Sequence, residues 1–121
     1  MEIYRFDRDV GRPIEKYESS SIVYSPITRI SDPSSVGFMY IEPKGIVGYH
    51  KAPTTQLFLV VQGKGWVRGE DETRIIIEAG EAAFWKSDEG HEAGSETGMT
   101  AVIIQADMLD PNSFMPVKTE K

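Results

Sequence analysis

The stretch QLFLVVQGKGWVRG, residues 56–69, indicates the fold most directly. Residues 56–62 form an apolar run about as long as a strand, which is typical of a strand buried on both faces or nearly so. Gly63-Lys64-Gly65 predicts a hairpin turn, because glycine reaches positive φ at little cost. Trp66–Arg68 is then expected to form the next strand, which runs back beside the first. The centre of the chain is therefore predicted to be β-structure.

Short apolar runs separated by turn residues continue on both sides of this stretch. They are Met1–Phe6, Ser21–Ile30 (interrupted by Pro26), Val36–Glu42, Thr73–Glu78, Glu81–Trp85 and Thr100–Ala106. No segment predicts a helix of ordinary length, although Asp110-Pro111 could begin a short helical turn. Short strands at this spacing favour an all-β protein with a closed or double-sheet antiparallel architecture.

Composition narrows the class of protein. A length of 121 residues predicts one domain, 1–121. The net charge of −6 argues against a general affinity for nucleic acid or for anionic membranes. The absence of cysteine excludes disulfides, thiolate metal sites and cysteine nucleophiles. There is no signal-peptide layout and no apolar run of the roughly 20 residues that a spanning helix needs. We therefore expect a cytoplasmic protein.

The only two histidines, His50 and His91, each lie in a glycine-bounded motif. The first motif runs from Gly45 through His50, Ala52 and Gln56 to Gly63, and the second runs from Gly80 through Lys86 and Asp88 to His91. These motifs resemble the two signature motifs of the cupin superfamily, with some metal ligands replaced. Ala52 stands at the second histidine position, and Gln56 stands at the position of the acid.

The resemblance covers about Val36 to Ala106. It implies a small single-domain cupin, with a cupin-type jelly-roll β-barrel (a double-stranded β-helix). The barrel core would span residues 36–106, preceded by N-terminal strands within 1–30 and followed by a tail, 107–121, with a frayed end. It also implies a homodimer, for which Met1–Phe6 is the candidate edge strand.

Side-chain alternation places the candidate pocket. Residues two apart in a strand share a face, so Gln56 and Phe58 point the same way. In the register that the resemblance implies, this face lines the barrel, where His50 and His91 meet it. We expect a ligand pocket of His50, Gln56, Phe58 and His91, with Tyr40 and Trp85 as further aromatic walls. The alternative for the aromatic residues is an ordinary place in the core or in a dimer interface.

A divalent transition metal such as Zn, Fe, Mn or Ni would find His50, Gln56 and His91 as ligands. Imidazole is a good ligand for these ions, whereas the amide of Gln56 lacks the charge of a carboxylate. The leading hypothesis is therefore a small-molecule-binding barrel with a degenerate site, for a sugar, an organic acid or an amino-acid-like ligand. One alternative is a metal-dependent enzyme of dioxygenase or isomerase/epimerase type. Another is an inactive regulatory or interaction domain. No catalytic residue follows from the sequence, and whether the protein is an enzyme stays open.

Overall fold

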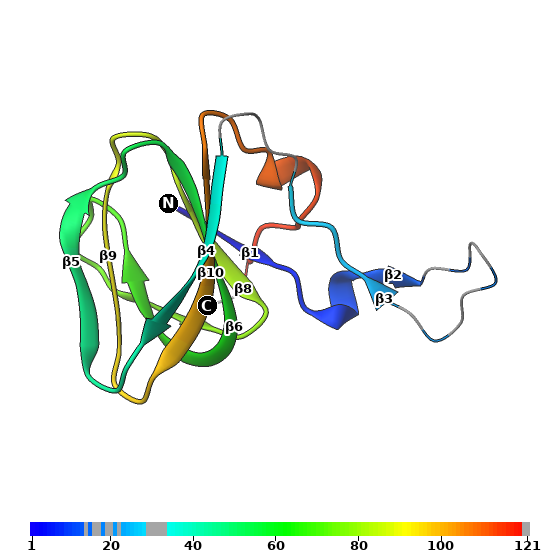
Figure 1. Ribbon diagram of the computed structural model, residues 1–121, viewed down its shortest axis with the longest axis horizontal. Helices are drawn as coiled ribbons and strands as arrows, with labels where there is room; N and C mark the ends of the chain where they lie inside the picture. Colours follow the sequence, from blue (N-terminus) through cyan, green and yellow to red (C-terminus); the bar gives the residue numbers. More distant parts are fainter. Residues whose placement is uncertain (14, 16–17, 19–20, 22, 29–33, 120–121) are drawn as a thin grey trace.

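The strands lie in two facing layers in the computed structural model, which describes residues 1–13, 15, 18, 21, 23–28 and 34–119 (Figure 1). The strands with described bounds are β1 (Glu2–Arg5), β2 (Arg12–Pro13), β3 (Val23–Tyr24), β4 (Ser34–Ile41), β5 (Gly45–Lys51), β6 (Thr55–Arg68), β7 (Ile75–Glu78), β8 (Glu81–Trp85), β9 (Gly90–Ser95) and β10 (Met99–Ala106). The short 3-10 helices η1 (Arg8–Val10) and η3 (Pro111–Ser113) follow β1 and β10. The predicted all-β jelly roll is confirmed.

The long strand β6 belongs to both layers. Its first half pairs with β8 and β10, within the order β1-β8-β6-β10-β4. Its second half pairs with β7 and β9, and β9 also pairs with β5. The predicted hairpin at Gly63-Lys64-Gly65 is therefore wrong. Gly63 has a φ of 80°, so its positive φ lets one continuous strand bend from one sheet into the other rather than reverse.

Alternation along β6 builds two apolar clusters. Phe58 and Val60 face the interior between the layers, where they join Trp85. Leu57 and Leu59 face outward and are nevertheless buried, at 0% and 2% exposure. The first half of β6 is thus buried on both faces, as its apolar run predicts.

The C-terminal segment covers the outer face and edge of the first sheet. Met115 is 3% exposed and belongs to the outer cluster. The Arg5 N–H donates to the Pro116 carbonyl at 3.1 Å, and the Lys118 N–H donates to the Ile3 carbonyl at 2.6 Å. The tail is therefore bound to the barrel up to Lys118, and the prediction of a frayed end is wrong for these residues. Met1–Phe6 does not offer a free edge to a second chain either, because the tail occupies it.

Parts of the N-terminal region outside β1 pack on the barrel, because Phe6 and Ile27 contact the outer cluster. The short β2–β3 hairpin projects away from the two layers (Figure 1). Of the predicted strand Ser21–Ile30, only Val23–Tyr24 is a strand, and residues 22, 29 and 30 lie outside the described part. Of the helices in the described part of the chain, none has the length and apolar character that crossing a bilayer requires.

Candidate functional site

Strand pairing brings the two histidines together. His50 on β5 and His91 on β9 are direct partners in the antiparallel register, just after a register shift that follows Val47. Their ring centroids lie 4.4 Å apart, with 55° between the ring planes. The loops next to the two histidines are also joined, because the Ala52 N–H donates to the Glu89 carbonyl at 3.0 Å. The two motifs are therefore joined to each other by strand pairing and by this hydrogen bond.

The imidazoles border a cavity of about 100 Å³ between the two layers. It is lined by Met39, Val47, His50, Gln56, Phe58, His91, Ala93, Ile103 and Gln105, which come from β4, β5, β6, β9 and β10. The predicted residues His50, Gln56, Phe58 and His91 all belong to this lining. Apolar walls with a few convergent polar groups are typical of small-molecule sites.

Gln105 lines the cavity although neither histidine motif includes it. It is the direct partner of Gln56 across β6 and β10. Opposite residues in antiparallel strands have Cβ atoms about 4.5–5.5 Å apart, so the two amides lie side by side in the cavity wall. Alternation in the predicted strand Thr100–Ala106 could have found it, because Ala101, Ile103 and Gln105 share one face.

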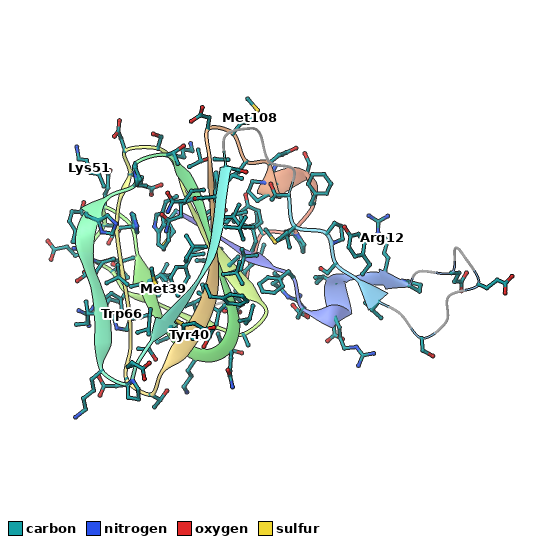
Figure 2. All side chains as sticks on the ribbon, viewed as in Figure 1. Arg12, Met39, Tyr40, Lys51, Trp66 and Met108 are labelled. Carbon is teal, nitrogen blue, oxygen red and sulfur yellow. The ribbon has the colours of Figure 1, made fainter. Side chains whose placement is uncertain are left out.

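The two aromatic residues predicted as pocket walls, Trp85 and Tyr40, lie in different places. Trp85 is fully buried and stacks on the His91 ring, with centroids 4.5 Å apart and 29° between the planes. It supports His91 from behind and is not among the lining residues. Tyr40 is 69% exposed and borders a different surface hollow. Its neighbour on β4, Met39, lines the cavity instead (Figure 2). The prediction that Tyr40 lines the cavity is wrong. Neighbouring residues of a strand point to opposite faces, so Met39 faces the cavity and Tyr40 faces away from it.

Hydrogen bonds to backbone carbonyls orient both imidazoles, and burial favours the neutral form of His91. His50 Nδ1 lies 2.8 Å from the Gly48 carbonyl oxygen, and His91 Nδ1 lies 3.5 Å from that of Glu89. A carbonyl only accepts, so we assign the proton of each neutral ring to Nδ1 and the lone pair to Nε2. Burial, and then the charge of nearby His50, lowers the pKa of His91. The hydrogen bond and charge of Glu89 oppose this shift only in part.

The donor set does not fit a tightly held divalent ion. Catalytic metal ions usually have three strong protein ligands, with imidazole or carboxylate groups. The cavity offers His50 and His91, but its remaining donors are the neutral amides of Gln56 and Gln105. Ala52 has no donor atom in its side chain. Among the described residues, no three His, Cys, Asp or Glu side chains are grouped to hold a metal.

Comparison with known proteins defines the family. The cupin domain profile matches residues 37–106 of the chain, which is more than half of it. The chain therefore belongs to the cupin family, whose members commonly bind divalent metals or small ligands and often form oligomers. A comparison with curated proteins finds no match.

Solved structures similar to this chain include proteins named as cupins and proteins named for enzymes. A cupin superfamily protein from Desulfitobacterium hafniense is 15% identical, with a TM-score of 0.58 and coverage of 73% of this chain and 80% of its own. A predicted oxalate decarboxylase from Thermotoga maritima is 22% identical, with a TM-score of 0.53 and coverage of 57% and 62%. A structure of DMSP lyases is 17% identical, with a TM-score of 0.56 and coverage of 63% and 40%. At these identities the likeness shows the fold alone.

Proposed function

We propose that this protein is a small-molecule-binding cupin that takes a small, uncharged, hydroxyl-bearing compound between its two layers of strands. The observation that carries the proposal is the meeting of two imidazoles and two amides in one apolar-walled cavity of about 100 Å³. Buried polar groups are costly unless they are hydrogen-bonded. Gln56 and His91 are buried, at 6% and 3% exposure, so a ligand that forms hydrogen bonds with them, and with the exposed His50 and half-buried Gln105 beside them, is stabilised in the cavity.

Charge favours an uncharged ligand over an organic acid or an amino acid. No lysine, arginine, aspartate or glutamate is among the residues that line the cavity. The lowered pKa of His91 further favours its neutral form, so this ring offers little to an anion. A carboxylate in the cavity would lose its hydration without gaining a partner charge.

Hydrogen-bonding capacity and volume narrow the ligand further. The Nε2 atoms accept, whereas the amides of Gln56 and Gln105 both donate and accept. A hydroxyl group can donate to an imidazole and accept from an amide. The cavity is well below the roughly 300–1,000 Å³ of sites for drug-sized ligands. A ligand the size of a three-carbon polyol or hydroxyketone is the expected class.

Calorimetry and thermal unfolding with matched compounds test this proposal. We expect glycerol or dihydroxyacetone to bind, and lactate and alanine to bind at least about tenfold more weakly, since the charged groups find no partner. Gln56→Leu and Gln105→Leu should abolish binding, because they remove the amides at similar size. The control Gln62→Leu changes an exposed residue of the same strand and should bind as the wild type does. Tighter binding of lactate than of glycerol would contradict the proposal.

A metal-dependent enzyme of dioxygenase or isomerase/epimerase type is the second candidate. The hydrogen bond from His50 Nδ1 to the Gly48 carbonyl favours it, because metal-ligating histidines commonly donate their other ring N–H in this way. Two of the similar structures are also named for enzymes. Stoichiometric, submicromolar binding of Zn, Mn, Fe or Ni that is lost in both His50→Ala and His91→Ala would favour this candidate over the first.

If neither small compounds nor metals bind, an inactive regulatory or interaction domain becomes the better interpretation.

Two further proposals concern where the protein acts and in what form. The absence of cysteine and the acidic composition support a cytoplasmic location. Membership of the cupin family supports a homodimer.

A further inference from the structure

Trp66 lies on the outer face of the layer that β5, β7, β9 and the second half of β6 form. Its neighbour Val67 is 0% exposed, so alternation directs Trp66 away from the interior. Strand pairing sets Trp66 between Ile76 on β7 and Gly94 on β9. A Cβ added at Gly94 would stand 2.6 Å from the indole, so the lack of a side chain there lets the indole lie across β9. The pairing and the glycine together fix the place of this ring.

The guanidinium group of Arg74 stacks on this indole. Its central carbon lies 3.7 Å from the ring centroid, well within the roughly 6 Å that a cation–π interaction requires. Among the described residues, no carboxylate forms an ion pair with Arg74, whereas Arg68 pairs with Glu92 at 2.6 Å. A guanidinium group held by an aromatic ring keeps its N–H donors for an anion. Arg74 is therefore oriented before any ligand arrives.

A hollow of about 410 Å³ opens beside the stacked pair. The side chains that line it are those of Lys64, Trp66, Arg74, Ile76, Glu96 and Thr97. This volume falls within the roughly 300–1,000 Å³ of known ligand sites, whereas the histidine cavity has about 100 Å³. The two share no lining residue. The hollow is therefore a separate site on the outside of the barrel.

The charged side chains around the hollow match a single negative charge. Lys64 and Arg74 are positive, and Glu96 is negative. Glu78 lies opposite Lys64 in the register of β6 and β7, so its carboxylate offsets part of the charge of Lys64. A phosphate dianion would be repelled by both carboxylates, whereas one carboxylate group can pair with the guanidinium group alone.

We infer that this hollow binds a small aromatic carboxylate, as a second ligand site outside the barrel. The carboxylate accepts hydrogen bonds from Arg74 in the two-pronged geometry that arginine favours. The ring of the ligand covers Ile76, which is 63% exposed, and the exposed part of the indole, so apolar surface leaves water. Contact with an indole stabilises an aromatic ring beyond the area it buries, which favours a ring over an aliphatic chain.

Tryptophan fluorescence at neutral pH tests this inference, because the chain has two tryptophans and Trp85 is fully buried. Benzoate should change the emission of Trp66 along a saturation curve. Benzyl alcohol keeps the ring without the charge, and acetate keeps the charge without the ring, so both should bind at least about tenfold more weakly. Phenyl phosphate should also bind more weakly than benzoate. No saturation with benzoate, or binding of any of the other three compounds as tight as that of benzoate, would overturn the inference.

Variants and NMR locate the binding. Arg74→Gln should raise the dissociation constant of benzoate at least about tenfold, and so should Arg74→Lys, which keeps the charge but loses the planar fork. The control Arg8→Gln removes an exposed arginine of η1 and should bind as the wild type does, with circular dichroism to show that each variant folds.

In the wild type, benzoate should shift the indole Nε1 resonance of Trp66 and leave those of His50 and His91 unchanged. Unchanged affinity in Arg74→Gln, or shifts at the histidines instead of Trp66, would overturn the inference. The readouts of the hollow and of the histidine cavity are separate, so the failure of one proposal leaves the other standing.

Discussion

Replacing Phe58 by alanine tests whether the wall of the cavity is also part of the core. Phe58 is 2% exposed and meets Trp85 edge-on, with ring centroids 5.9 Å apart. Truncating a buried phenylalanine costs about 3–5 kcal/mol, and an aromatic pair accounts for about 0.5–1.5 kcal/mol of such a loss. The side chain borders a cavity of about 100 Å³, so water can enter part of the new space. We therefore expect a loss of about 3–4 kcal/mol.

Urea unfolding followed by tryptophan fluorescence measures this loss. A chain of 121 residues has a free energy of unfolding of roughly 6–18 kcal/mol, so Phe58→Ala should still fold. Phe58→Leu, which keeps most of the volume, should cost only about 1–1.5 kcal/mol. Val61→Ala, at a 44% exposed position of the same strand, should stay within about 0.5 kcal/mol of the wild type. A loss below about 1 kcal/mol for Phe58→Ala would refute the placement of its ring between the layers.

Three further predictions concern His91, the close approach of β6 to β9, and the tail. The pKa of His91 is lowered in the folded protein from its ordinary value of 6.5, so near that pH the unfolded chain binds more protons than the folded one. The free energy of unfolding should therefore fall as the pH drops through that value, and it should fall less in His91→Gln. An equal pH dependence of the two proteins in urea titrations would contradict this. Gly65→Ala should cost about 2–4 kcal/mol, because the new Cβ would collide with the Gly94 carbonyl, whereas Gly48→Ala, which meets nothing within 4 Å, should unfold thermally like the wild type. Met115→Ala should cost about 2–4 kcal/mol by denaturant unfolding, and Met108→Ala, at 69% exposure, should cost almost nothing; equal losses would mean that the tail does not pack on the sheet.

Strands β4, β6, β7, β8 and β10 could be predicted because their apolar runs have the length of a strand and end at turn residues, whereas β5 and β9, which carry the two histidines, lie outside the predicted runs. Glu81–Trp85 matches β8 to the residue. Gly63 misled because positive φ serves a hairpin turn and a bend between sheets equally well. The pairing of the second half of β6 with β7 and with the more distant β9, rather than with its own first half, decides between them.

The candidate site could be predicted in part for the same reason. The spacing of the motifs located His50, Gln56 and His91, because β5, β6 and β9 keep the register that the motifs imply. Tyr40 was misassigned because its strand carries apolar residues on both faces, so alternation alone does not say which face is inside. Covering of the sheet by the tail likewise depends on tertiary packing rather than on local pattern.

A nitrogen-correlated NMR spectrum of the imidazoles tests the central claim most directly, because the chain has only two histidines. Their rings lie 4.4 Å apart on one cavity. We predict that a small uncharged polyol or hydroxyketone shifts the resonances of both histidines together, with one saturation curve, and that Gln56→Leu abolishes both shifts. Two results would contradict the account: shifts confined to one histidine, or resonances that stay unchanged with every uncharged compound and shift only when a transition metal is added.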